Sequence, residues 1–122
     1  MTTGNGATPR ARDRRLRRRA DFDRVLQQGR HNSGRLLAVR SISNQAGITR
    51  FGYAVSKRVG KAVVRNRVRR RLREIARSLP LAEGFDVVIT ARPESASAGF
   101  RELKAETELL LRRARLLQAP PD

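Results

Sequence analysis

The sequence predicts an α+β protein in which a single mixed β-sheet packs against helices, in the order α-β-β-β-α-β-α. Apolar residues at helical spacing mark residues 59–78, and a nearly continuous apolar run at 85–91 is typical of a buried central strand. Segments rich in apolar and β-branched residues, which are typical of strands, precede this helix and this strand. With 122 residues, the chain is long enough for one domain with one modest core.

The N-terminal part of the chain is expected to hold an arm and a short helix. Residues 1–13 are mostly small or polar and include Gly and Pro, which predicts a disordered arm ahead of a domain at 14–118. An amphipathic helix is predicted over about 20–28, because three apolar residues recur there at helical spacing. These residues are Phe22, Val25 and Leu26.

Strands are predicted after this helix. Residues 35–42 and 49–56 each suit a strand, and the turn residues Asn44 to Gly47 between them predict that the two form a hairpin. A weaker pattern at 30–33 indicates a third, shorter strand.

The second half of the chain is expected to alternate helix, strand and helix. The helix at 59–78 should end at Pro80, which lacks the backbone N–H that a helix needs. A last helix is predicted at 99–118, followed by a tail at 119–122, and the strand–helix–strand unit at 49–91 would follow the usual right-handed rule. Five apolar residues of the helix at 59–78 fall within an arc of about 80°, which suits packing on a sheet. They are Val64, Val68, Leu72, Ile75 and Leu79.

The charge of the chain is strongly positive and is confined to its first two-thirds. There are 28 Lys+Arg against 11 Asp+Glu, a formal net charge of +17, and residues 1–77 hold 22 of the basic and only 4 of the acidic side chains. Like charges at this density repel one another in a compact chain, so a polyanionic partner is expected. Nucleic acid is the leading candidate, and an anionic membrane surface is the alternative.

Several classes of protein are excluded by composition. The chain has no cysteine, which excludes disulfides, a thiol nucleophile and zinc-finger frameworks. No segment has the apolar core of a secretory signal or the length of a membrane span, so a soluble, cytoplasmic protein is expected.

The predicted helix at 59–78 carries the strongest signal for function. Residues 62–78 contain seven arginines and a single carboxylate, Glu74. Arginines stand at i,i+4 spacing at 65/69, 69/73 and 73/77, and each such like-charge pair costs about 0.2–0.5 kcal/mol. A solvated face would mix its signs, so contact with the phosphates of a nucleic acid is favoured. The basic run at 14–19 is either an arm that orders on binding or an unstructured basic segment.

Nothing in the sequence indicates catalysis by side chains or a metal site. The single histidine, His31, lies in a polar stretch without a carboxylate to orient it, and no carboxylate pair lies close in sequence within the basic region. Asp21 and Asp23 are expected to cap the first helix. The aromatic residues are expected in the core, except that Phe22, beside a basic run, stays open as a base-stacking residue.

Residues 51–77, FGYAVSKRVGKAVVRNRVRRRLREIAR, resemble the most characteristic stretch of the protein subunit of bacterial ribonuclease P. Its hallmark is the triplet Arg65-Asn66-Arg67 followed by a basic helix, set within the frame SKRVGKAVVRNRVRR. Residues 15–30 and 85–93 also resemble parts of that family, so the resemblance covers roughly residues 14–117. The frame is highly specific when a helix and a strand surround it in this order.

The resemblance implies a fold and separate roles for the protein and the RNA subunit. The fold would be related to a ribosomal-protein domain, with a left-handed β–α–β crossover in place of the usual hand. The enzyme would be a ribonucleoprotein that removes the 5′ leader from precursor tRNA by hydrolysis, in which the RNA subunit holds the catalytic Mg²⁺ and performs the chemistry. The protein would be a monomer that binds ribonuclease P RNA and the single-stranded leader, with no membrane partner.

The resemblance also implies two sets of binding residues. By match with the family, the RNA subunit would be bound by Arg65, Asn66, Arg67, Arg69, Arg70 and Arg73. The precursor-tRNA leader would be bound by Phe22, Leu26, Arg40, Ser56 and Lys57. Aromatic residues are common in the family where this chain has Leu26 and Arg40. Weaker base stacking is therefore expected, with Arg40 offering a guanidinium plane or a phosphate contact.

Three other functions stand as alternatives. A small ribosomal protein would have similar charge but would sediment with ribosomal subunits and have no effect on tRNA processing. A stand-alone nuclease would cleave RNA without a partner and would depend on His31. A DNA-binding helix protein would need a helix–turn–helix frame, whereas strands are predicted on both sides of this basic helix.

Overall fold

The computed structural model describes residues 15–118, so the predicted arm at 1–13 and tail at 119–122 lie outside the described residues. The predicted order of helices and strands is confirmed, with a short 3-10 helix, η2, added before the last helix. The elements are α1 (Arg19–Gln28), β1 (Arg30–Ser33), β2 (Leu37–Ser43), β3 (Arg50–Ala54), α2 (Ala62–Ser78), β4 (Phe85–Ala91), η2 (Pro93–Ser97) and α3 (Phe100–Arg113).

The four strands form one mixed sheet in the order β1-β2-β4-β3. β4 is antiparallel to β2 and parallel to β3, which confirms the predicted mixed sheet. The predicted hairpin between 35–42 and 49–56 is wrong, because β4 lies between β2 and β3 and the hairpin partner of β2 is β1. The physical reason is the composition of β4: Val87, Val88 and Ile89 are fully buried, so both faces of this strand must be covered at the centre of the sheet.

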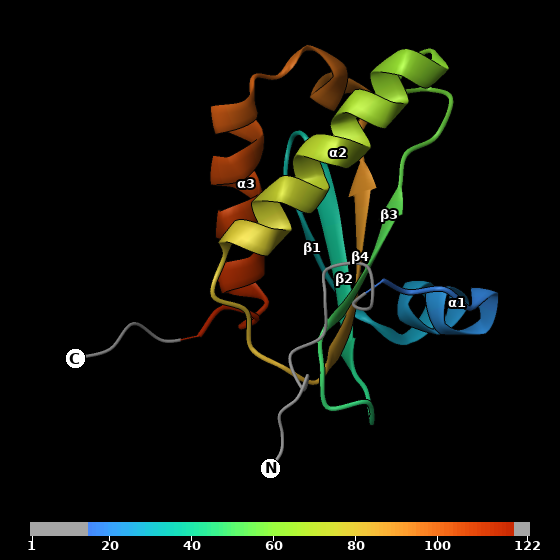
Figure 1. Cartoon of the computed structure of the whole chain (residues 1–122), viewed down its shortest axis with the longest axis vertical. Coiled ribbons are helices and arrows are strands. Elements are labelled where there is room, and N and C mark those ends of the chain that lie inside the picture. The colour runs from blue at the N-terminus through green and yellow to red at the C-terminus, as the bar shows by residue number, and fades with distance from the viewer. Residues whose placement is uncertain (1–14, 119–122) are drawn as a thin grey trace, which may run out of the picture.

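The connection from β3 through α2 to β4 is left-handed. In Figure 1, α2 lies in front of the sheet while the chain passes from β3 to its neighbour β4 on the left, with both strands pointing upward. The right-handed expectation from the general rule is therefore wrong, and the hand implied by the family resemblance is confirmed. A right-handed connection would place α2 on the opposite face, where α1 packs.

The two faces of the sheet are covered unequally. α2 and α3 lie side by side on one face and build the main core, in which Val68, Leu72 and Ile75 are fully buried as the predicted apolar stripe requires. On the other face, α1 crosses the strands alone over a small cluster formed by Leu16, Val25 and Val88. Much of that second face is therefore left for other contacts.

Two predicted helix boundaries are corrected. α2 begins at Ala62 and not at 59, because Val59 N–H and Gly60 N–H donate to Ser56 and Lys57 in a tight turn. α3 ends at Arg113 and not at 118, because the backbone turns at Arg115, where φ is 61°.

The predicted capping of α1 by aspartates is also wrong. Arg18 is the N-cap residue and makes no side-chain capping hydrogen bond. Asp21 instead forms an ion pair with Arg50 (3.9 Å), and Asp23 pairs with Arg19 (3.8 Å).

Candidate RNA interface

The exposed side of α2 is strongly basic, and Glu74 is the one carboxylate of the helix. The apolar stripe packs on the sheet, which leaves Asn66, Arg70, Arg73 and Arg77 exposed on the opposite side of the helix. Within residues 15–118, no carboxylate lies within ion-pair distance of any α2 arginine. The charge on this side of the helix is thus not neutralised by the described part of the chain.

The arginines that flank the stripe have different surroundings. Arg65 Nε donates to the Gly60 carbonyl (3.1 Å), Arg67 Nη2 to the Ala96 carbonyl (3.2 Å), and Arg71 Nη1 to the Ala98 carbonyl (3.2 Å). All three side chains are half-buried, and they tie α2 to the turn before it, to η2 and to the residue that follows η2. Arg67 Nε is buried and finds no acceptor among the described residues.

The structure therefore divides the six residues predicted to bind the RNA subunit. Asn66, Arg70 and Arg73 are exposed, whereas Arg65, Arg67 and Arg69 are half-buried. Arg69 Nη1 donates to Asn66 Oδ1 (3.0 Å), which leaves the Asn66 NH₂ group free to donate outward. Arg65 and Arg67 can bind a partner only through the guanidinium N–H groups that the backbone carbonyls do not occupy, and their predicted role stays a prediction.

Three of the residues predicted to bind the leader meet at α1. Phe22 and Leu26 lie one turn apart, and Arg40 Nη1 reaches from β2 to the Leu26 carbonyl (2.9 Å). The Phe22 ring packs directly against Gly52, where a β-carbon would overlap it. The glycine in β3 thus makes room for the ring, a role that the sequence pattern did not indicate.

Ser56 and Lys57 lie apart from that group, in the exposed turn after β3. Ser56 Oγ accepts the backbone N–H of Arg58 (3.3 Å). Ala54, two residues before Ser56, packs against the same cluster as Phe22. β3 therefore connects the two parts of the predicted leader set, although no hydrogen bond joins them.

A buried carboxylate organises the opposite end of β3, and sequence reasoning missed it. Asp86 on β4 is fully buried and accepts hydrogen bonds from Arg50 Nε (2.8 Å), Arg50 Nη2 (2.9 Å) and Asn44 Nδ2 (2.7 Å). The hydrogen bond to Asp86 is the largest influence on the pKa of Arg50 and raises it, against the lowering effect of burial. The partners lie 36 and 42 residues apart, so no local signal could have found them.

Tyr53 on β3 lies near enough to α2 for the charges of Arg73 and Arg77 to act on it. Its ring stacks with that of Phe51, with centroids 6.1 Å apart, and it packs against the main core as predicted for the aromatic residues. Burial raises the pKa of the Tyr53 hydroxyl well above its usual value, and the nearby charges of Arg73, Arg77 and Arg15 offset this only in part.

Among residues 15–118, no group of three or more His, Asp or Glu side chains lies close enough to hold a metal ion. His31 is exposed on β1, opposite Arg40 in the strand pair. No helix in this part of the chain has the length and apolarity to cross a membrane. What the described residues offer chemically is an array of guanidinium groups, some exposed and some held by hydrogen bonds.

The fold and this surface define a class: a small, basic α+β protein that presents one arginine-rich helix face to a polyanion. Comparison with known proteins then gives the family, because the family model described as Ribonuclease P matches residues 11–115. The chain belongs to the ribonuclease P protein family.

Individual relatives agree with this assignment. The chain is 43% identical over 107 residues to the ribonuclease P protein component of Symbiobacterium thermophilum, a match that covers 85% of this chain and 93% of that protein. The solved structure of the Staphylococcus aureus RNase P protein has a TM-score of 0.79 at 26% identity, covering 86% of this chain and 98% of that one. The RNase P protein from Thermotoga maritima gives 0.72 at 30% identity, covering 80% and 96%.

Proposed function

We propose that this chain is the RNA-binding protein subunit of ribonuclease P, the endoribonuclease complex that removes the 5′ leader from precursor tRNA by hydrolysis. The observation that carries the proposal is the exposed side of α2, whose arginines have no carboxylate partner within residues 15–118. Membership of the family implies a role in tRNA 5′ processing and an RNase P RNA partner, which supports that RNA as the polyanion for this surface.

The RNA subunit carries the chemistry in this proposal. It holds the catalytic Mg²⁺, while Asn66, Arg70 and Arg73 bind its backbone and the half-buried arginines of α2 assist with their remaining N–H groups. Arginine suits this task because its planar fork makes two parallel hydrogen bonds to a phosphate. Each phosphate neutralised also releases counterions, so binding should weaken steeply with salt.

The single-stranded leader is bound on the α1 side of the sheet. Phe22 offers a ring, Leu26 an exposed apolar side chain, and Arg40 a guanidinium plane held in place by the Leu26 carbonyl. Ser56 and Lys57 supply a hydroxyl and a charge for the backbone of the leader. The subunit acts as a monomer in the cytoplasm and needs no membrane.

The proposal is tested by cleavage of precursor tRNA at low Mg²⁺ with the protein alone, the matching ribonuclease P RNA alone, and both together. We expect efficient cleavage at the leader junction only in the mixture, and His31→Ala should leave that rate unchanged. Cleavage by the protein alone, abolished by His31→Ala, would identify a nuclease. A mixture no faster than the RNA alone would contradict the role as a subunit.

A further inference from the structure

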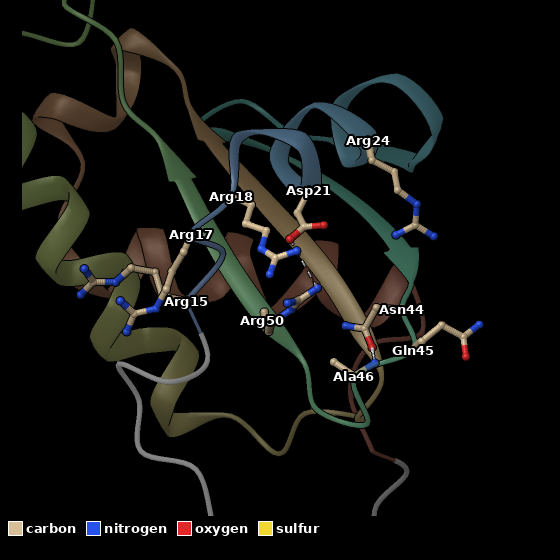
Figure 2. Close-up of a pocket in the computed structure, with 9 residues that line it drawn as sticks. All are labelled: Arg15, Arg17, Arg18, Asp21, Arg24, Asn44, Gln45, Ala46 and Arg50. Carbon is tan, nitrogen blue, oxygen red and sulfur yellow. Dashed lines mark hydrogen bonds and ion pairs between the residues drawn. The ribbon is translucent and has the colours of Figure 1, made fainter.

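An open pocket of about 650 Å³ lies on the α1 side of the sheet, beside the connection between β2 and β3. Figure 2 shows Arg18 and Asp21 from the start of α1 beside Arg50 of β3. Arg15 and Arg17 lie to one side of β3 in this view, and Arg24 lies to the other. We call these six residues, with the β2–β3 connection at 44–46, the α1 pocket.

The charge of the α1 pocket is strongly unbalanced, with five arginines and one carboxylate among its lining residues. Arg50 is fixed by its two hydrogen bonds to Asp86, and Arg24 Nη2 donates to the Ser43 carbonyl (3.1 Å). Two of the five N–H donors of Arg50 are used in this way, so three remain. Within residues 15–118, Arg15 and Arg18 have no carboxylate within ion-pair distance. Arg24 and Arg50 are thus held in place at the hollow, and Asp86 already balances the charge of Arg50. Arg15, Arg18 and Arg24 add positive charge that no carboxylate within residues 15–118 pairs with.

The α1 pocket is separate from the predicted leader residues. At 100° per residue, Asp21 and Arg24 lie on one flank of α1 and Phe22 and Leu26 on the other, with the fully buried Val25 between them facing the sheet. The predicted leader residues and the pocket thus lie on opposite flanks of α1.

The pocket is instead joined to the basic side of α2 around the outer edge of β3. Leu16 N–H donates to the Phe51 carbonyl (2.8 Å), which lays the chain at Arg15 along the edge of that strand. Arg15 lies near enough to Tyr53 for its charge to lower the pKa of the hydroxyl, as the charges of Arg73 and Arg77 of α2 also do. Arg15 is also part of the pocket wall. Positive charge therefore continues from one face of the sheet to the other.

We propose that the α1 pocket binds backbone phosphodiesters of the same structured RNA that lies against α2, so that this RNA wraps the β3 edge and is held from both faces of the sheet. The proposal rests on the proposed function, which makes that RNA the ribonuclease P RNA. Guanidinium groups held by Asp86 and Ser43 suit phosphate groups, because little side-chain freedom is left to lose on binding.

The test measures the affinity of the full chain for ribonuclease P RNA at several salt concentrations. Arg18→Gln with Arg24→Gln removes two charges from the pocket, and Arg101→Gln with Arg113→Gln removes two exposed charges from α3 as a matched control. We expect the pocket variant to lower the slope of log K against log salt by about one to two, and the control to leave it unchanged. A wild-type slope in the pocket variant would overturn the proposal.

A second variant distinguishes the loss of a phosphate contact from a loss of folding. Asp21→Asn removes the carboxylate from the pocket wall, so it should tighten binding and steepen the slope, whereas a misfolded chain would only bind more weakly. Unchanged or weaker binding by Asp21→Asn would count against the pocket as a phosphate site.

Two further comparisons separate this proposal from its rivals. If the wild-type chain binds ribonuclease P RNA no better than an unrelated RNA of equal length, the proposed function fails and the pocket proposal fails with it. If Arg70→Gln with Arg73→Gln weakens binding but the pocket variant matches the control, only the pocket proposal fails. A pocket variant that loses affinity only for precursor tRNA with long leaders would make the leader the occupant and would also overturn it.

Discussion

α2 and α3 pack side by side on one face of the sheet, yet they satisfy their charges in opposite ways. The carboxylates of α3 act within the protein: Glu102 accepts the Gly99 N–H (3.0 Å), and Glu106 accepts the N–H groups of Leu36 (2.6 Å) and Leu37 (2.7 Å). The arginines of α2 donate only to carbonyls or to Asn66, and their charge has no counterpart in the described chain. The two helices pack on the sheet in the same way, but only α2 carries charge that needs a partner outside the described chain.

The comparison predicts that the largest loss of stability comes from α3. Glu106→Ala leaves the N–H groups of Leu36 and Leu37 without an acceptor, and the free energy of unfolding should fall by about 2–4 kcal/mol. Urea unfolding measures this. Glu108→Ala is the control, because the exposed Glu108–Arg112 pair (3.3 Å) should contribute less than about 1 kcal/mol. Equal, small losses for both variants would show that Glu106 does not hold the start of β2.

The next effect is on RNA binding and comes from α2. Arg70→Gln with Arg73→Gln should lower the affinity for ribonuclease P RNA about tenfold or more and reduce the salt slope by about two. The free energy of unfolding should change by less than about 0.5 kcal/mol, because both side chains are exposed. Arg101→Gln with Arg113→Gln on α3 should change neither quantity. If the α3 pair weakens binding as much as the α2 pair, the contrast between the helices is wrong.

A smaller effect distinguishes two neighbouring arginines of α2. Arg71→Met removes the hydrogen bond to the Ala98 carbonyl and should lower the free energy of unfolding by about 1 kcal/mol. Arg70→Met, one residue away on the exposed side, should cost almost no stability but should reduce the salt slope of RNA binding more than Arg71→Met does. The reverse ranking would mean that the two arginines have been assigned to the wrong roles.

The smallest effect is a dependence on pH at Tyr53. Burial favours the neutral hydroxyl, so the folded chain holds this proton more tightly than the unfolded chain, whose pKa is near 10.0. The tightly held Tyr53 proton therefore adds fully to the free energy of unfolding below that pH, and this contribution is lost as the pH rises above it. By about pH 10.5 the loss should reach roughly 0.8 kcal/mol. Tyr53→Phe should show a shallower decline in urea unfolding across this range, whereas an identical decline would assign the dependence to another group.

What could be predicted from the sequence followed from local periodicity. The spacing of Val68, Leu72 and Ile75 placed the apolar stripe of α2 correctly, and the exposure of Asn66 and Arg70 followed from the same geometry. The order of helices and strands could be predicted for the same reason, because each element has its own spacing of apolar residues.

What could not be predicted depends on contacts between distant residues. The hairpin between the second and third strands was wrong because the central position goes to β4, which lies later in the chain. The acceptors of Arg67 and Arg71 lie 29 and 27 residues downstream, and Asp86 lies 36 residues from Arg50. Helical spacing separates the arginines that flank the stripe from those opposite it, but no local pattern identifies the distant carbonyls to which Arg67 and Arg71 donate.

The most direct test of the central claim is to map which helix faces the RNA. The chain has no cysteine, so Glu74→Cys on the exposed side of α2 and Leu109→Cys on the exposed side of α3 each give a single attachment site for an iron–EDTA group that cleaves nearby RNA. In complexes with ribonuclease P RNA that remain active on precursor tRNA, the group at position 74 should cut the RNA backbone at discrete positions and the group at position 109 should not. Cleavage from position 109 that equals or exceeds cleavage from position 74 would contradict the account.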